Sequence, residues 1–106
     1  LAVRSANEYH KTEPDFRYLV GRIVSGDQFI EDKQKVLAFR EKYNALCTEM
    51  EGAAVAHTAY ANGVPFIVMR TISDNADENA DMSFNEMAVI AADRVSFIVK
   101  EMIRLY

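Results

Sequence analysis

The sequence predicts an α/β fold in which a narrow parallel sheet is covered by helices. Apolar segments at 18–27, 45–49 and 64–72 alternate with helical patterns, an order typical of parallel strands joined by crossover helices. The third segment, "VPFIVMRTI", is apolar on both faces, as strands buried between helical layers are. Because three strands make a narrow sheet with two open edges, we expect a partial sheet with flanking helices.

The first half of the chain contains an expected strand between two expected helices. The opening "LAVRSANEYH" has the pattern of a helix tail, and polar residues 7–15 separate it from the first strand. "YLVGRIVSGD" indicates that buried strand, which breaks at Gly26. "DKQKVLAFREKYN" predicts a helix because Val36, Phe39 and Tyr43 recur at helical spacing, and Asn44 is a typical helix stop.

The second half continues the alternation of strands and helices. "ALCTE" indicates a short strand, and "EGAAVAHTAYANG" an alanine-rich helix that Gly63 and Pro65 close. Ser83 and Glu86 form a capping-box pattern ahead of a long last helix. The expected apolar stripe of that helix comprises Phe84, Met87, Ala88, Ala91, Val95, Ile98 and Met102.

Composition and charge limit the class of protein. The 106 residues are 50% hydrophobic, which is typical of one compact domain. A net charge of −4 with no Lys/Arg-rich block argues against nucleic-acid and membrane partners. The single cysteine excludes an internal disulfide, and neither a signal peptide nor a twenty-residue apolar span is present, so we expect a soluble cytoplasmic protein. The chain begins with Leu1, and we expect it to be a piece of a longer protein, although a processed chain would begin in the same way.

Acidic residues follow all three expected strands. The strand ends read "SGDQF", "TEMEG" and "SDNAD", and ligands of open α/β sheets bind at the carboxyl ends of strands. The acids at this rim are Asp27, Glu49, Glu51 and Asp74. Because neighbouring carboxylates repel one another, some of their pKa values should rise, which suits a general acid near neutral pH. This pattern predicts a small-molecule site at the rim of the sheet.

Each of these residues also has a structural interpretation. An acid after a strand is typical of a helix N-cap or a solvated turn, and Glu51 alone could be a first-turn acid that the helix dipole favours. Phe29 and Met50 alone are equally typical of core or lid residues. A buried Arg70 would need a carboxylate partner.

Metal and cofactor sites are not expected. His10, His57 and Cys47 lack the spacing of metal ligands. His57 is more typical of a packing or interface residue, and Cys47 of a small buried hydrophobe. "SGD" is too short for a glycine-rich phosphate loop.

Three motifs, in their order and spacing, resemble a known family. "VSGDQFI", "EMEGAAVAH" and "VPFIVMRTISDNAD" are similar to 5'-methylthioadenosine/S-adenosylhomocysteine nucleosidases, within the purine nucleoside phosphorylase superfamily. The similarity runs from about Leu19 to the end. It implies a three-layer phosphorylase/hydrolase-like fold, with residues 1–106 as the C-terminal part of a single nucleosidase domain whose N-terminal half is absent.

The resemblance also implies an activity. The family hydrolyses the N-glycosidic bond of methylthioadenosine and adenosylhomocysteine and releases adenine, in nucleoside catabolism and methionine salvage, as a cytoplasmic homodimer without a cofactor. Asp74 would be the general acid that protonates N7 of adenine, and Ser73 would orient its carboxyl group. Glu51 would hold the ribose hydroxyls. The glutamate that activates water would belong to the missing half, so we expect this piece alone to be inactive.

The remaining site residues follow from the same resemblance. Phe29 would stack on the base while the backbone of Ile30 reads its edge, and Met50 would pack beneath the sugar. Phe84 would line the pocket for the 5'-thio group, and Arg70 would lie near the water network. Two alternatives stay open: a purine nucleoside phosphorylase, and a non-catalytic binding or dimerisation remnant.

Overall fold

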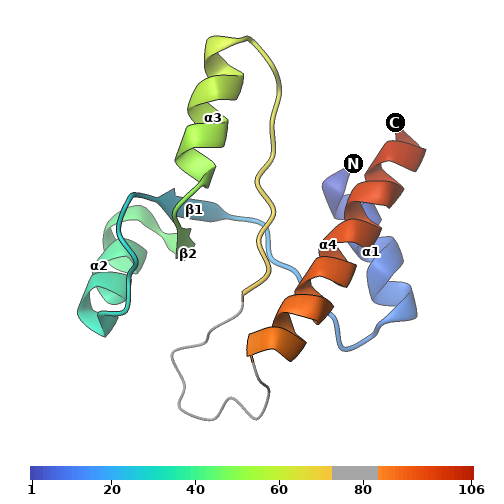
Figure 1. Ribbon diagram of the computed structural model, residues 1–106, viewed down its shortest axis with the longest axis horizontal. Helices are drawn as coiled ribbons and strands as arrows, with labels where there is room; N and C mark the ends of the chain where they lie inside the picture. The colour runs from blue at the N-terminus through green and yellow to red at the C-terminus, as the bar shows by residue number, and fades with distance from the viewer. Residues whose placement is uncertain (73–83) are drawn as a thin grey trace. The chain divides into compact units, whose positions relative to one another are not determined.

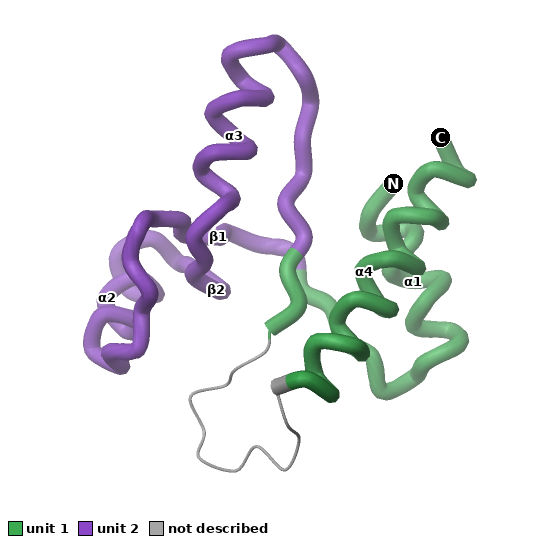
Figure 2. The backbone as a smooth tube through the Cα atoms, in the orientation of Figure 1, with its two compact units in different colours: residues 1–19, 70–106 green, residues 20–69 purple. Residues whose placement is uncertain are grey.

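The computed structural model describes residues 1–72 and 84–106 (Figure 1). In chain order its elements are α1 (Ala2–Thr12), β1 (Arg22–Ser25), α2 (Lys33–Tyr43), β2 (Ala45–Glu49), α3 (Gly52–Ala61) and α4 (Phe84–Leu105). The predicted α/β class is confirmed. The chain divides into two compact units, residues 20–69 and residues 1–19 with 70–106 (Figure 2).

The unit of residues 20–69 is built on a parallel pair of strands. β1 pairs with β2, and the register places Ser25 opposite Glu49. Beyond the last pair, the Gly26 backbone N–H donates to the Glu49 carbonyl oxygen at 3.1 Å. Helix α2 makes the crossover between the strands, as parallel pairing requires. The carboxyl ends of both strands therefore lie side by side.

The ends of α2 are fixed by local sequence. Asp32 is the N-cap, and its carboxylate accepts a hydrogen bond of 2.8 Å from the Gln34 backbone N–H. Asn44 ends the helix in the left-handed conformation, with φ of 52° and ψ of 41°, which Asn tolerates better than most residues. The predicted helix and its stop are confirmed. Its expected apolar stripe is less buried than the pattern indicated, because Val36 and Tyr43 are exposed and Phe39 is half-buried.

The prediction of a third strand in 64–72 is wrong. Helix α3 ends as expected, with Gly63 at a φ of +63°, but no strand follows in 64–72 (Figure 1). A strand exists only where a neighbour takes up its backbone hydrogen bonds, and in residues 1–72 and 84–106 the two strands pair with each other. β1 is also shorter than predicted, since Leu19 and Val20 are exposed and precede it.

The second unit is an α-helical pair with an aromatic core. α1 packs on α4, and the buried residues are Ser5, Ala6, Phe16 and Ile98. The Tyr9 ring lies 4.8 Å, centroid to centroid, from the rings of Phe16 and Phe97. The stripe predicted for α4 is largely confirmed, because Met87, Ala91, Val95, Ile98 and Met102 are half-buried or buried, although Ala88 is exposed. Ser83 and the side chain of Phe84 lie outside the described residues.

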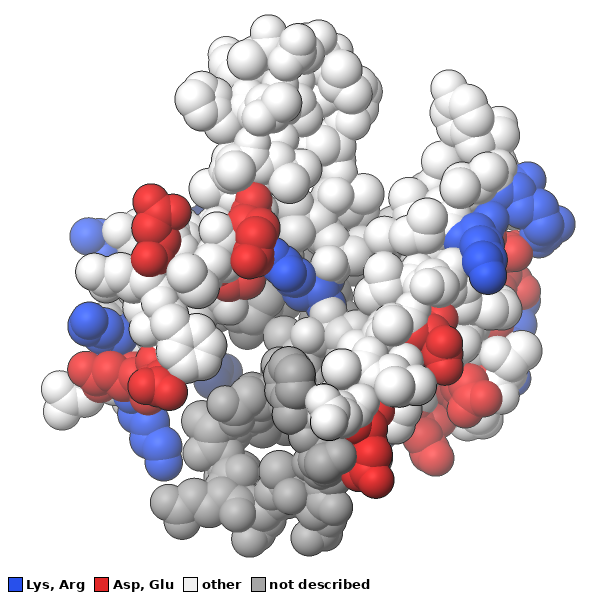
Figure 3. Space-filling model, viewed as in Figure 1, with Lys and Arg blue, Asp and Glu red and all other residues white. Residues whose placement is uncertain are grey.

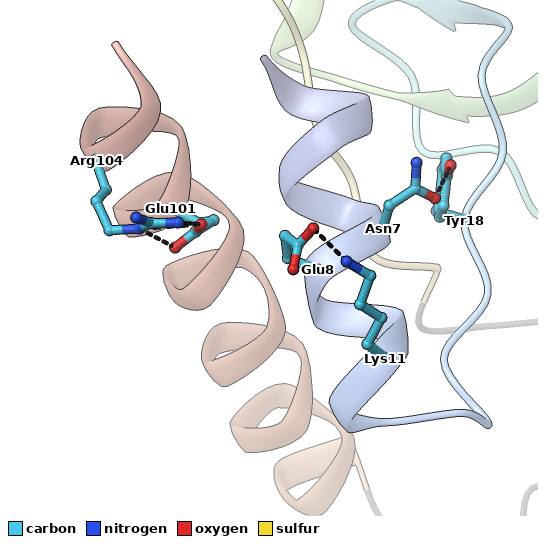
Figure 4. A network of polar contacts seen from close by, with 6 residues as sticks. All are labelled: Asn7, Glu8, Lys11, Tyr18, Glu101 and Arg104. Atoms are coloured by element: carbon cyan, nitrogen blue, oxygen red, sulfur yellow. Dashed lines mark hydrogen bonds and ion pairs between the residues drawn. The ribbon is translucent and has the colours of Figure 1, made fainter.

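Polar contacts line the outside of this unit (Figure 4). Lys11 pairs with Glu8 at 2.6 Å, Arg104 pairs with Glu101, and the Tyr18 hydroxyl donates to Asn7 at 2.7 Å. The Glu8–Lys11 pair joins residues three apart on α1, which supports a helix. Helix α1 continues to Thr12, through part of the polar stretch 7–15 that was expected to lie between elements. Of the helices in the described ranges, none combines the length and the apolar character that a membrane span needs.

Candidate active-site rim

The carboxyl ends of β1 and β2 form one continuous rim. Ser25 and Glu49 are partners in the register, and each is half-buried. Helix α3 starts only three residues after Glu49 and contacts β1. Two of the three acidic strand ends predicted from the sequence therefore meet at one edge. The third, with Ser73 and Asp74, lies outside the described residues.

Glu49 binds the backbone at the start of α3. Its carboxylate accepts hydrogen bonds from the Glu51 N–H at 2.9 Å and from the Gly52 N–H at 2.9 and 2.7 Å. The first N–H groups of a helix have no partner inside the helix, and an anion close to them is stabilised by the helix dipole. Glu49 is thus a structural anion at this helix start.

Ser25 supplies the next contact from the other strand. Its hydroxyl oxygen accepts a hydrogen bond of 2.9 Å from the Ala53 N–H. Three consecutive backbone N–H groups, at 51, 52 and 53, are therefore bound by two side chains from the ends of β1 and β2. This arrangement ties the turn between β2 and α3 to both strands.

Gly52 allows close packing at this turn. The residue is buried, and a Cβ atom built on it would lie 2.5 Å from Oε1 of Glu49, which is inside van der Waals contact. A glycine thus lets the helix start approach the carboxylate. Helix capping was the structural alternative for the acids that follow strands, and for Glu49 it is correct. The roles of Ser25 and Gly52 were not predicted from the sequence. The spacing "ExxG" at the beginning of α3 is the signal that could have indicated them.

Glu51 takes part in this arrangement through its backbone N–H. It occupies the N-cap position of α3, with φ of −117° and ψ of −21°, but its side chain makes no capping hydrogen bond. The residue is exposed at the rim. Its position at the start of α3 is one where the helix dipole favours an acid, so the structure is compatible with the helix-stabilising interpretation of Glu51 as well. An exposed carboxylate on a firmly held turn is suited to accept hydrogen bonds from ligand hydroxyl groups.

The other predicted binding residues of this unit are accessible. Phe29 is 75% exposed and Ile30 is half-buried, in the segment between β1 and α2. Met50, between Glu49 and Glu51, is 41% exposed. A core role for Phe29 is therefore excluded within this structure, and its ring is available to a ligand.

Two predicted residues belong to the other unit. Arg70 is exposed and is not in a strand, in contrast to the expected late-strand position. Phe84 is the first residue of α4. The described structure thus brings together Ser25, Glu49, Met50 and Glu51, whereas the placement of Asp74 relative to them stays a prediction.

Comparisons with known proteins identify the family. Residues 2–104 match the family model described as the phosphorylase superfamily. The chain is 41% identical, over 103 residues, to the aminodeoxyfutalosine nucleosidase of Helicobacter pylori (strain J99 / ATCC 700824), covering 97% of this chain and 43% of that protein. No solved structure matches.

Two further relatives carry the name that the motifs suggested. The chain is 42% identical over 84 residues to the 5'-methylthioadenosine/S-adenosylhomocysteine nucleosidase of Treponema pallidum (strain Nichols), covering 77% of this chain and 31% of that protein. It is 44% identical over 80 residues to the protein of the same name from Exiguobacterium sp. (strain ATCC BAA-1283 / AT1b), covering 74% of this chain and 34% of that protein. The chain spans less than half the length of these relatives. The resemblance seen in the motifs is confirmed, and the chain belongs to the phosphorylase superfamily.

Proposed function

We propose that the full-length protein containing this chain hydrolyses the N-glycosidic bond of adenine nucleosides with a modified 5' position and releases adenine. The similarity to proteins named nucleosidases supports this reaction class. The observation that carries the proposal within the structure is the exposed Glu51 on a turn whose capping role belongs to Glu49. In this proposal, residues 1–106 are the C-terminal part of a single nucleosidase domain.

The proposed chemistry needs a protonated leaving group and a stabilised sugar cation. The bond between C1' of the ribose and N9 of adenine breaks, and its electron pair leaves with the base. Asp74, oriented by Ser73, donates a proton to N7, so that adenine leaves as a neutral molecule. The carboxylate of Glu51 accepts hydrogen bonds from the ribose hydroxyls and supports the oxocarbenium-like transition state. Water then adds to C1' and loses its proton to a base in the N-terminal half.

The remaining site residues bind the nucleoside and the water. The exposed ring of Phe29 stacks on adenine, and the Ile30 backbone binds the edge of the base. Met50 packs beneath the sugar next to Glu51. Phe84 lines the 5' pocket, and Arg70 contributes to the network that holds the water. The proposed site uses no metal ion and no cofactor.

The substrates that we propose are 5'-methylthioadenosine and S-adenosylhomocysteine, with a place in methionine salvage. Aminodeoxyfutalosine is a second candidate, because the relative covering 97% of this chain carries that name. Ratios of kcat/KM for the three nucleosides, measured on the full-length protein, rank them. A preference for aminodeoxyfutalosine of tenfold or more would replace the first assignment.

Product analysis tests the reaction class. The full-length protein is incubated with methylthioadenosine in the presence and absence of phosphate, and adenine and the sugar product are quantified. We expect equal adenine release in both, with a free reducing sugar. A sugar 1-phosphate that forms only with phosphate would instead establish a phosphorylase. Binding of the nucleoside without turnover would favour a non-catalytic binding module.

We further propose that the protein is a cytoplasmic homodimer whose interface includes α3. The helix sequence, "GAAVAHTAYA", contains no charged residue, and Figure 3 shows no Lys, Arg, Asp or Glu over α3 in this view. A shallow apolar groove runs along it, lined by Ala54, Val55, Thr58, Ala59, Asn62 and Val64. Small residues allow helices to approach closely. Sedimentation of the full-length protein as a monomer would contradict this proposal.

A further inference from the structure

We propose that Ser25 and Glu49 are positioning residues that fix the carboxylate of Glu51 for ribose recognition. This inference rests on the proposed function of Glu51. It adds two residues, one from each strand, whose side chains bind the backbone of the turn and not the substrate. The evidence is the set of hydrogen bonds at the start of α3.

The two side chains hold different parts of the same turn. Glu49 binds the N–H of Glu51 itself, at 2.9 Å, and the N–H of Gly52. Ser25 binds the N–H of Ala53 from a position 28 residues earlier in the chain. The turn is consequently anchored to β2 through Glu49 and to β1 through Ser25. A displacement of α3 along its axis would have to break both sets of bonds.

Rigid placement matters at this position because Glu51 is exposed and has a long side chain. A carboxylate binds a hydroxyl group only over a narrow range of O···O distances, about 2.5–3.0 Å. A shift of about 1 Å in a positioning element can reduce the rate roughly 10²-fold. The backbone of Glu51 is therefore the part that the protein can fix in advance, and its N–H is bound directly.

The interaction predicts a specific kinetic signature. A shift of about 1 Å can cost roughly 10²-fold in rate, so Ser25→Ala, which removes one of the hydrogen bonds that hold the turn, should reduce kcat/KM by a smaller factor, roughly 2- to 10-fold. Because the effect passes through Glu51 to the ribose, the preference for a ribonucleoside over its 2'-deoxy analogue should fall by a similar factor. Ser25→Thr retains a hydroxyl acceptor and should restore most of this preference.

The experiment is a double-mutant cycle in the full-length protein. Adenine release from methylthioadenosine and from its 2'-deoxy analogue is measured for wild type, Ser25→Ala, Glu51→Gln and the double variant. If Ser25 acts through Glu51, Ser25→Ala should change kcat/KM less than twofold in the Glu51→Gln background. Glu49→Gln, which replaces one acceptor oxygen by an amide donor, is measured in the same cycle as an independent second variant. Melting temperatures are recorded for all variants, because a general loss of folded protein would reduce the rates for both substrates equally.

The outcomes separate the inference from the function on which it rests. A wild-type protein that releases no adenine would refute the proposed function and this inference with it. An active wild type whose Ser25→Ala and Glu49→Gln variants keep the full ribose preference would refute the inference alone. An equal loss of activity in the wild-type and Glu51→Gln backgrounds would show a merely structural role.

Discussion

The Glu49 carboxylate and the α-carbon of Gly52 are packed so closely that a methyl group on Gly52 would lie 2.5 Å from Oε1 and 3.1 Å from Cδ of Glu49. This contact makes the two positions dependent on each other. A side chain at 52 must displace the carboxylate, and a displaced carboxylate no longer binds the N–H groups of Glu51 and Gly52.

Gly52→Ala should therefore lower the free energy of unfolding of the full-length protein by about 0.5–2 kcal/mol, the usual loss when a helix cap is removed. The sign should reverse when Glu49 is first replaced by Ala. In that background no carboxylate remains to clash, and alanine is up to about 1 kcal/mol better than glycine in a helix. Urea denaturation of the four proteins measures both effects. Equal destabilisation by Gly52→Ala in both backgrounds would exclude the proposed dependence.

Two phenylalanines are expected to respond in opposite ways to truncation. Phe16 is 8% exposed and its ring contacts Tyr9 and Arg94, so Phe16→Ala should lower the free energy of unfolding by about 3–5 kcal/mol. Phe29 is 75% exposed, so Phe29→Ala should leave that quantity nearly unchanged. If Phe29 stacks on adenine, its replacement should instead raise KM or Kd about 5- to 150-fold, because stacking of a base on an aromatic ring is worth roughly 1–3 kcal/mol. Thermal melts and nucleoside titrations on both variants test this contrast, and unchanged binding by Phe29→Ala would remove it from the site.

Asp74→Asn should reduce kcat by roughly 10²-fold or more, because the amide keeps the size of the side chain but has no proton to transfer. Binding of adenine nucleosides should change far less. Glu51→Gln should instead weaken both binding and turnover, since its contact with the ribose exists in the ground state and the transition state. Steady-state kinetics on the full-length protein distinguish the two patterns. An Asp74→Asn protein that turns over normally, together with an Asp74→Ala protein whose free energy of unfolding falls by about 0.5–2 kcal/mol, would identify Asp74 as a helix cap, because Asn caps a helix about as well as Asp.

The pair of Glu101 and Arg104 predicts a pH dependence of stability. Hydrogen bonds from the Arg104 guanidinium, helped by its charge, lower the pKa of Glu101 below the ordinary value of 4.5. A group whose pKa is lower in the folded state stabilises the fold above its unfolded pKa, and this contribution disappears as the pH falls through the folded value. The stability difference between wild type and Glu101→Gln should therefore be present at pH 7 and vanish once the pH has fallen below the lowered pKa of Glu101.

High salt should also reduce this difference, because the pair is at the surface. Arg104→Gln provides the matched control. In that background, Glu101→Gln should give no pH-dependent difference in denaturation midpoint. A difference that persists there would assign the effect to another partner of Glu101.

The features that the sequence predicted best are those determined by residues close together in the chain. The end of α2 at Asn44 and the close of α3 at Gly63 were correct because left-handed conformations are encoded locally. The prediction of a third strand was wrong because an apolar segment becomes a strand only when a neighbouring strand pairs with it. In the described structure, 64–72 does not pair with a strand. The sequence also could not show which of Glu49 and Glu51 binds the start of α3 with its side chain. This depends on which carboxylate meets the start of α3, and the contact from Ser25 comes from 28 residues away.

The bond from Ala53 to Ser25 makes one backbone amide a reporter of tertiary structure. Amide hydrogens in the first turn of a helix normally exchange quickly with solvent, since they have no partner inside the helix. The Ala53 amide is bound by a side chain of β1, so its hydrogen exchanges when this contact opens, either by rotation of the Ser25 side chain or by separation of α3 from the strand. Its deuterium uptake therefore measures how often the contact between β1 and the start of α3 opens, and a ligand that binds at the rim through Glu51 should slow it.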